Sequence, residues 1–321
     1  MTKYGWRWFR KKIIHSVVKK RVSDDLEIHA QNESGQQPSH AVLTHEAAFG
    51  YPRDFLSNQF VYVAISPRAR GLSIGVNLNP VMKCNLDCLY CEVDRTKPPS
   101  ASLFDIDRMA KELGETLELV QGGWLRQWPR YKNLPAELLE VRHVALSGDG
   151  EPTLSSHFVE AIRSVVNLRA TGRRFKIVLL TNSTALDQPN AQAGLGLLEN
   201  QDEVWAKFDG GTQEYFHRLN GSGVSLLKIM TNILLVARRR PVVIQSLFPA
   251  INGEEPPDFE IEEYARRLKE LKQAGAEISL VQIYSANRPM ARQGCSHLPL
   301  KTLSLIAQRV RRVTGLRAEV Y

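Results

Sequence analysis

Cysteine is scarce in this sequence, with 4 among 321 residues. So few cysteines do not make a disulfide framework, and a reducing compartment is expected. Long apolar runs are missing too, because no stretch approaches the roughly 18 consecutive apolar residues of a transmembrane helix. The N-terminus also lacks the apolar core and the cleavage site of a secretory signal. We therefore expect a cytoplasmic protein without a membrane span.

Acidic residues are absent from residues 1–22, which makes the charge of the chain uneven. Of the 42 Lys and Arg residues, 8 lie in this arm, so the other 34 match the 34 Asp and Glu residues, and the formal net charge of +8 belongs to the arm. Trp6, Trp8 and Phe9 are interleaved with the charges. Such an arm suits the phosphate backbone of RNA or an acidic membrane surface. The alternatives are a solvated helix packed on the body and an organelle-targeting segment.

A dinucleotide-binding fold receives no support, since no G-x-G-x-x-G follows the first expected strand, and no repeat period indicates a solenoid. Instead, apolar, β-branched runs alternate with segments of helical period. We expect strands at 75–81, 141–148, 175–182, 203–209, 241–248 and 278–285, and helices at 103–121, 155–170, 190–199, 224–239, 258–274 and 299–314. This alternation predicts an α/β fold with a parallel sheet, either doubly wound or a partial barrel. Residues 1–58 are expected to be a basic arm and an irregular lead-in, and residues 59–321 one domain.

Polar segments follow the expected strands at their carboxyl ends. The cysteines come after the first run, and "SGDGEPT", "TNS", "KFDGG" and "NGEE" come after the next four. In α/β folds this edge of the sheet carries the chemistry. The agreement across five loops predicts a functional site there.

Cys84, Cys88 and Cys91 stand in the pattern C-x3-C-x2-C within one predicted loop. Independent buried thiols are a poor account of three cysteines within eight residues. A structural zinc site is a second interpretation, but its usual second C-x2-C pair is missing, so Cys295 or a histidine would have to complete it. The third interpretation is an iron–sulfur cluster, whose irons are held by thiolates.

This pattern, with an aromatic residue before its last cysteine, resembles the signature of the radical S-adenosylmethionine (radical SAM) superfamily. The resemblance implies a partial (β/α)6 barrel, in which Cys84, Cys88 and Cys91 hold a [4Fe–4S] cluster and the amino and carboxylate groups of S-adenosylmethionine chelate the fourth iron. It also implies cleavage of S-adenosylmethionine to a 5′-deoxyadenosyl radical that abstracts hydrogen from a substrate. Tyr90 is then expected near the adenine, and an electron donor such as flavodoxin or ferredoxin is an expected partner.

Further candidate cofactor-binding residues lie at the ends of the next three strands. Gly148, Asp149, Gly150 and Glu151 resemble the family's "GGEP" position, where glycines permit close backbone approach and carbonyls accept hydrogen bonds from an ammonium. The other candidates are Thr181, Asn182, Lys207 and Asp209. Helix capping is an alternative role for Asn182, and a structural ion pair is an alternative for Lys207 and Asp209. Cys295 is a candidate catalytic thiol, although a lone cysteine is more often inert.

The stretch "SPRARGLSIGVNLNPVMKCNLDCLYCEVDR", with "SGDGEPTL" and "LLTNST", resembles the iron–sulfur oxidoreductase group related to wyosine-forming tRNA enzymes. Those enzymes carry additional N-terminal cysteines for a second cluster. No cysteine precedes Cys84 here, so a second three-cysteine site is impossible. The basic arm favours tRNA or another RNA as substrate. Modification or activation of a peptide or protein is the alternative, and a metal-stabilised RNA-binding module without catalysis is the non-enzymatic one.

Overall fold

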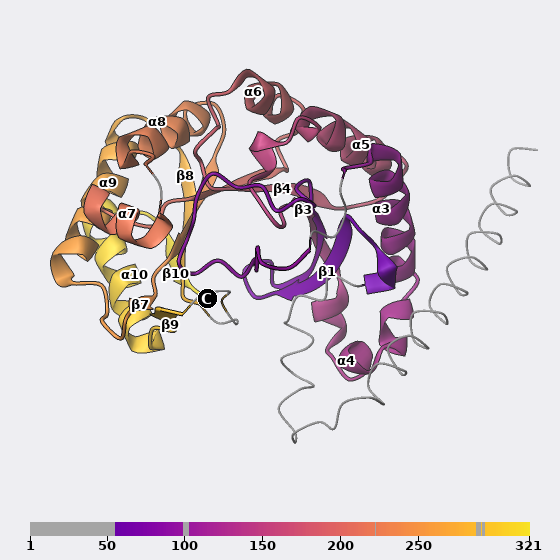
Figure 1. Ribbon diagram of the computed structural model, residues 1–321, viewed down its shortest axis with the longest axis horizontal. Coiled ribbons are helices and arrows are strands. Elements are labelled where there is room, and N and C mark those ends of the chain that lie inside the picture. The colour runs from indigo at the N-terminus through magenta and orange to yellow at the C-terminus, as the bar shows by residue number, and fades with distance from the viewer. Residues whose placement is uncertain (1–54, 99–102, 222, 287–289, 291–292) are drawn as a thin grey trace, which may run out of the picture. The chain divides into compact units, whose positions relative to one another are not determined.

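The computed structural model of the chain describes residues 55–98, 103–221, 223–286, 290 and 293–321 (Figure 1). The basic arm at 1–22 lies outside these ranges, and the predicted domain boundary after residue 58 stays a prediction. Contacts divide the chain into two units, residues 1–76 with 105–143 and residues 77–104 with 144–321. Within the described ranges, no helix is long and apolar enough to cross a membrane.

The first unit is built on an antiparallel β-hairpin of β1 (Val61–Ser66) and β2 (Gly71–Val76). The short 3-10 helix η1 (Phe55–Ser57) precedes the hairpin, and α3 (Ile106–Gln121) contributes the buried Glu112. The Glu112 carboxylate accepts the backbone N–H groups of Gln59 and Phe60 at 3.0 and 2.9 Å, which ties the chain entering β1 to the helix. Shorter helical turns follow at η2 (Trp124–Gln127), α4 (Pro129–Lys132) and η3 (Ala136–Leu139), and they lead to β3 (Val141–Leu146).

The second unit contains the strand order β3-β4-β5-β6-β8-β10. Its strands are β4 (Lys176–Thr181), β5 (Glu203–Lys207), β6 (Val242–Leu247), β8 (Ile278–Tyr284) and β10 (Ala318–Val320), and each neighbouring pair from β4 onward is parallel. The connections are η4 (Pro152–Leu154), α5 (Phe158–Ala170), α6 (Pro189–Leu195), α7 (Gln213–Asn220), α8 (Leu226–Ala237), α9 (Asp258–Gln273) and α10 (Leu300–Thr314). Figure 1 shows α5, α6 and α8 on the outer side of these strands.

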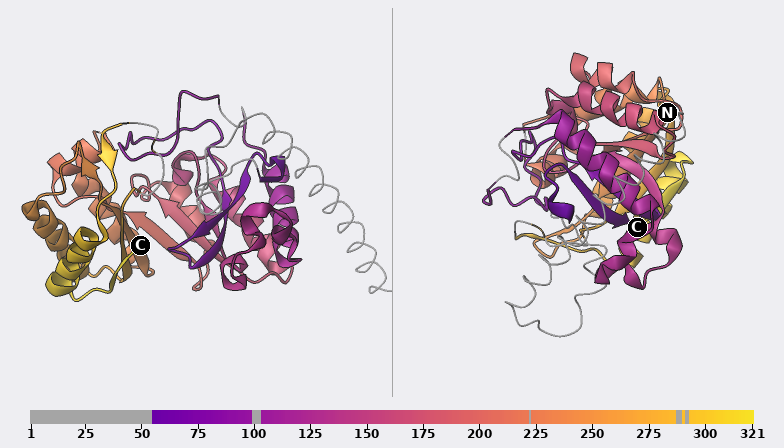
Figure 2. Two further views of the ribbon diagram at one scale, coloured as in Figure 1. Left: turned by 90° about the horizontal axis from the view of Figure 1, so that it is seen from below. Right: turned by 90° about the vertical axis from the view of Figure 1, so that its right-hand side faces the viewer.

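A smaller antiparallel ribbon joins β7 (Ala250–Ile251) to β9 (Cys295–Ser296) beyond the carboxyl end of β6. The helices α9 and α10 pack side by side at the same end of the second unit (Figure 2).

The inner face of the parallel sheet carries an apolar layer beneath a polar one. The apolar layer is Ala145, Val178, Trp205 and Val243, with Leu180 and Leu280 packed against it. Two residues further along each strand the side chain returns to the same face. At these positions the sheet carries Lys207, Gln245 and Gln282, which are register partners across β5, β6 and β8. The polar layer therefore lies at the carboxyl ends of the strands, where the sequence predicted the site.

The expected strand at 75–81 was wrong in its position, because the observed strand is Gly71–Val76. The Asn77 side chain accepts the backbone N–H of Asn79 at 3.1 Å, and Pro80 has no N–H to give to a ladder. This local turn ends the strand before the cysteines. The strands β1 and β10 and the helix α7 were not among the predicted elements.

Arg169 and Asp202 form a buried ion pair at the amino-terminal side of the sheet. The Asp202 carboxylate binds the Arg169 guanidinium at 2.5 and 3.1 Å and accepts the N–H groups of Ile177 and Glu199, both at 2.8 Å. Arg240 donates to the Glu199 and Asp202 carbonyls at 2.8 and 2.7 Å. One carboxylate thus joins α5 to the start of β4 and the approach to β5.

We expect Arg169→Gln to lower the free energy of unfolding by about 3–5 kcal/mol, because it leaves the Asp202 charge buried without its cation. Urea unfolding at neutral pH measures this change. Arg174→Gln is the control, since Arg174 is exposed and a surface change of this kind stays within about 0.5 kcal/mol. Equal losses in the two variants would contradict a special role for the pair.

Candidate functional site

The loop that carries the cysteines is fastened to the C-terminus of α7. Asp87 and Leu89 donate their backbone N–H groups to the carbonyls of Asn220 and Leu219, both at 2.9 Å. The last carbonyls of a helix have no partner within the helix, so they are available to the loop. Gly221 ends α7 with φ of 56°, and a Cβ there would lie 2.8 Å from the Asp87 carbonyl oxygen. Glycine at this position lets the loop approach the helix end.

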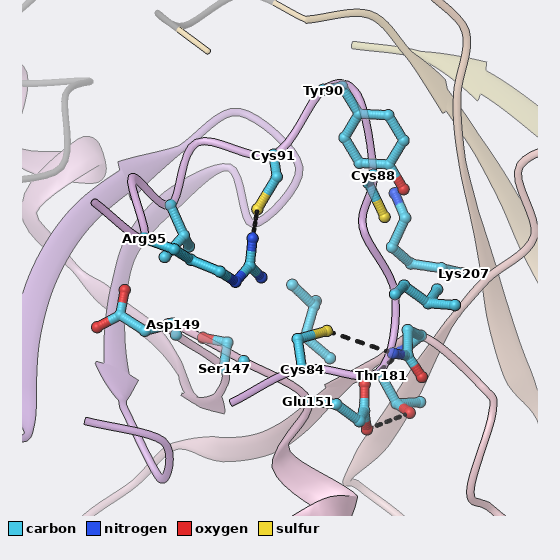
Figure 3. A pocket seen from close by; sticks show the side chains of 16 residues that line it. Cys84, Cys88, Tyr90, Cys91, Arg95, Ser147, Asp149, Glu151, Thr181 and Lys207 are labelled. Carbon is cyan, nitrogen blue, oxygen red and sulfur yellow. Dashed lines mark hydrogen bonds between the residues drawn. The ribbon is translucent and has the colours of Figure 1, made fainter. Parts of the chain in front are cut away.

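The three cysteine side chains line one pocket in the second unit (Figure 3). The same pocket is lined by most of the predicted cofactor-binding residues, namely Tyr90, Gly148, Asp149, Gly150, Glu151, Thr181, Asn182 and Lys207. Asp209 is not in the lining but binds two of its members, and Cys295 is outside the lining. Among the described residues, no three His, Cys, Asp or Glu side chains are grouped so as to hold a metal ion.

The turn after β3 touches the chain just before the first cysteine. A Cβ on Gly150 would lie 2.0 Å from the Lys83 carbonyl oxygen, and Gly148 has φ of 146°. Both positions therefore require glycine. The turn is also held by Asn77, whose side chain donates to the Asp149 carboxylate at 2.6 Å and accepts the Asp149 N–H at 3.1 Å.

The carboxylate of Glu151 is occupied by hydrogen bonds from neighbouring residues. Its carboxylate accepts the hydroxyls of Thr153 and Thr181 at 2.6 and 2.7 Å, and the backbone N–H groups of Thr153 and Asn182 at 3.2 and 2.6 Å. Burial raises the pKa of Glu151 above its usual range, although these hydrogen bonds oppose the shift. Glu151 thus has a structural role, in which it joins the turn after β3 to the end of β4.

Asn182 extends from the end of β4 to the cysteine loop. Its amide nitrogen donates to Asn85 at 2.9 Å and lies 3.8 Å from the Cys84 sulfur. Thr184 also binds Asn85, at 2.8 Å. The Thr181 hydroxyl is bound to Glu151 and so belongs to the wall of the site.

Lys207 places a partly buried ammonium group between the rings of Tyr90 and Tyr284. Its ammonium lies 3.2 Å from the Asp209 carboxylate and donates to the Tyr284 hydroxyl at 3.0 Å. It also lies 4.6 Å from the ring centroid of Tyr90 and 5.2 Å from that of Tyr284, within the range of cation–π attraction. Burial alone would lower the pKa of Lys207, but Asp209, Tyr284 and Cys88 together outweigh it and raise the pKa, so the side chain stays charged.

Tyr90 is held by its hydroxyl group, which donates to Asp209 at 2.5 Å. Asp209 also accepts the Leu247 N–H at 2.9 Å, so this carboxylate is fixed from three sides. Burial, and then the neighbouring Asp209 charge, raise the pKa of Tyr90. The phenol is therefore neutral, with its ring against Lys207 in the pocket wall.

Several site residues were missed by the sequence analysis, and four of them contact the cysteines or the turn after β3. Asn77 and Asn79 hold the turn after β3, and Asn79 does so by donating to the Glu151 carbonyl at 2.8 Å. Asn220 donates to the Cys88 sulfur at 3.2 Å, and Arg95 lies with its guanidinium 3.7 Å from the Cys91 sulfur. The two asparagines directly after a strand could have been recognised as a turn signal. Nothing in the sequence connects Asn220 with Cys88.

Cys295 lies on β9 opposite Ile251, outside the lining of the pocket. It packs with Tyr215, Leu219 and Ile251, next to Leu89 and Tyr90. Burial raises its pKa, which disfavours the thiolate. The catalytic role considered for Cys295 stays a prediction.

Comparison with known proteins gives partial sequence relatives and solved structures of similar fold. No protein-family model matches the chain. A UPF0026 protein of Helicobacter pylori strain J99 is 31% identical over 140 residues, which cover 42% of this chain and 38% of that protein. A UPF0026 protein of Synechocystis is 26% identical over 176 residues, 54% of this chain and 57% of that protein. The matches thus span well under two thirds of these curated relatives.

Among solved structures, TYW1 with a lysine–pyruvate adduct bound has a TM-score of 0.50 at 16% identity, covering 79% of this chain and 84% of that one. A mutant of spore photoproduct lyase has a TM-score of 0.50 at 9% identity, covering 80% and 78%. Identity this low shows the fold alone. The fold is therefore the partial α/β barrel of radical SAM enzymes, and the expected fold class is confirmed.

The likeness in fold to TYW1 agrees with the resemblance read from the sequence. These neighbours share the fold of this chain. They leave the reaction and the substrate of this chain open to proposal.

We expect Gly150→Ala to lower the free energy of unfolding by about 1–3 kcal/mol, since its Cβ would overlap the Lys83 carbonyl oxygen and push the two loops apart. Chemical denaturation measures the loss. Gly196→Ala is the matched control, because Gly196 has helical φ and ψ of −66° and −16° and its Cβ would find ordinary contacts from 3.4 Å. This control should be neutral or slightly stabilising. A Gly150→Ala variant as stable as the control would contradict the close contact.

Proposed function

We propose that this chain is a radical SAM enzyme in which Cys84, Cys88 and Cys91 hold a [4Fe–4S] cluster beside a bound S-adenosylmethionine. The observation that carries the proposal is the shared pocket: three thiols of one loop face the carboxyl ends of β3, β4 and β5 (Figure 3). This edge is where α/β folds bind ligands.

The donor set fits such a cluster. Thiolates are the ligands that iron–sulfur clusters take, and three from one short loop leave one position for another ligand. Each sulfur also has a nearby N–H group, from Asn182, Asn220 and Arg95 in turn, which compensates the negative charge of a thiolate. When bound, the cluster supplies the electron that cleaves the sulfonium of S-adenosylmethionine.

The residues around the pocket suit the polar ends of S-adenosylmethionine. The backbone carbonyls of the turn at 147–150 accept hydrogen bonds from its ammonium, and Gly148 and Gly150 leave the space for close approach. Lys207 provides a fixed positive charge for its carboxylate. Asp209 holds Lys207 in place and keeps it protonated. The rings of Tyr90 and Tyr284 flank the Lys207 ammonium and limit its contact with water.

We further propose an RNA base as the substrate and a flavodoxin- or ferredoxin-like protein as the electron donor. The support for RNA is the arm at 1–22, whose positive charge and interleaved aromatic residues suit a phosphate backbone and exposed bases. The resemblance of residues 66–95 to wyosine-related enzymes points to the same substrate class. Modification of a peptide or protein is the competing outcome of the test below.

Anaerobic reconstitution with iron and sulfide should give the protein a broad absorption near roughly 400 nm, typical of thiolate-bound clusters. Addition of dithionite and S-adenosylmethionine should then release 5′-deoxyadenosine. Replacing any one of Cys84, Cys88 and Cys91 by serine should abolish both signals. Cys295→Ser is the matched control and should keep the absorption. Stoichiometric zinc in place of iron, with no cleavage of S-adenosylmethionine, would refute the proposal.

Replacing the eight Lys and Arg residues within 1–22 by glutamine should weaken tRNA binding by about tenfold or more at physiological salt, because fewer counterions are released. Filter binding across a salt series measures the affinity and its salt dependence. The yield of 5′-deoxyadenosine without substrate should stay unchanged, since the pocket is built from other residues. Unaltered tRNA binding would argue against RNA and in favour of a peptide substrate.

A further inference from the structure

Each cysteine sulfur of the loop has an N–H group from a different part of the second unit. The Asn220 amide lies 3.2 Å from the Cys88 sulfur, the Arg95 guanidinium 3.7 Å from that of Cys91, and the Asn182 amide 3.8 Å from that of Cys84. The three donors differ in distance and in exposure, so they do not contribute equally.

Asn220 makes the shortest of these contacts, and its side chain is the most enclosed. It is 1% exposed, whereas Arg95 is an exposed residue whose charge is screened by water. Its amide nitrogen also lies 3.2 Å from the Tyr90 hydroxyl, and its backbone carbonyl accepts the Asp87 N–H at 2.9 Å. The helix end and the cysteine loop therefore fix the direction of this amide before any ligand binds.

We propose that Asn220, acting through the Cys88 sulfur, raises the reduction potential of the cluster; this inference rests on the proposed function. Reduction adds one electron from the external donor, and no covalent bond forms or breaks in the protein. The added charge is shared by the ligand sulfurs, so an N–H···S hydrogen bond stabilises the reduced state more than the oxidised state. Because Asn220 is buried, the difference is little screened by water.

Asn220 also joins the cysteine to the polar wall of the pocket. Its amide contacts both Cys88 and the Tyr90 hydroxyl, Tyr90 donates to Asp209, and Asp209 binds Lys207. A ligand that binds Lys207 would therefore contact a residue that is connected to Cys88 through Asp209, Tyr90 and Asn220. Within the described part of the chain Arg95 has no such link, since its side chain contacts the Cys91 sulfur and the Met82 carbonyl.

The test is a redox titration of the reconstituted full-length protein, in which the reduced cluster is followed by electron paramagnetic resonance. Asn220→Leu keeps the approximate size of the side chain and removes the N–H donor. We expect the reduction potential of the cluster to fall by about 59 mV, which is a tenfold shift toward the oxidised state for a one-electron couple. Asn220→Ser, too short to reach the sulfur, should shift it in the same direction and serves if the leucine variant does not fold.

Tyr215→Phe is the matched control on the same helix. Its hydroxyl is buried, and among the described residues it has no hydrogen-bond partner, so its removal should leave the potential unchanged. Arg95→Gln should shift the potential less than Asn220→Leu does, because Arg95 is exposed.

The outcomes separate the two proposals. If the unmodified protein takes up no cluster, the proposed function fails. If it does, and the Asn220 variants titrate at its potential or shift no more than Tyr215→Phe, the inference is overturned. Loss of the cluster from both Asn220 variants, with circular dichroism of the native fold, would also overturn it, because Asn220 would then hold the ligand in place and not tune it.

Discussion

The candidate site depends on the hydrogen bonds between the cysteine loop and the C-terminus of α7. The loop has no regular secondary structure of its own between β2 and α3 within the described residues. The backbone N–H groups of Asp87 and Leu89 donate hydrogen bonds to carbonyls at the helix end, which have no partner within the helix. On the opposite side, Gly150 allows the turn after β3 to touch the Lys83 carbonyl. The sulfurs face one pocket because the loop is held between these two contacts.

Buried charge in this region is balanced by its neighbours before any ligand is considered. The Glu151 carboxylate accepts four hydrogen bonds, and Asp209 is paired with Lys207 and bound by Tyr90 and Leu247. An isolated buried charge would cost several kcal/mol. These paired charges lie above the apolar layer of the sheet, which includes Trp205 and Val243. The wall of the pocket is therefore preorganised, and its charges do not depend on a ligand for compensation.

Much of the fold could be predicted from the sequence because parallel strands covered on both faces have strong apolar runs. The runs at 175–182 and 241–248 correspond closely to β4 and β6. The run at 75–81 failed because an asparagine turn, and not the apolar pattern, decides where β2 ends. The strand β10 has only 3 residues, too few for a period to be read.

The site was predictable where residues of one loop share a role, as the cysteines and the turn at 148–151 do. It was not predictable where the contact is made by residues far apart in the sequence. Asn220 lies 132 residues after Cys88, and its approach depends on how α7 ends, at Gly221 in a left-handed conformation. A helix end of this kind is a local signal, but what it faces is decided by tertiary structure.

The hydrogen bonds of the site also divide its residues into those that build the pocket and those that can still bind a ligand. Thr181, Glu151 and Asp209 are bound to other side chains and to backbone groups, so they shape the wall. Lys207 has three N–H donors and uses two of them, on Asp209 and Tyr284. Besides the cysteines, a ligand would therefore meet the remaining Lys207 donor, the Arg95 guanidinium, Ser147 and the backbone of the glycine turn. Such a pocket would bind the polar groups of a cofactor. Selection of the substrate then falls to other parts of the chain, which is the role that the proposal gives to the basic arm.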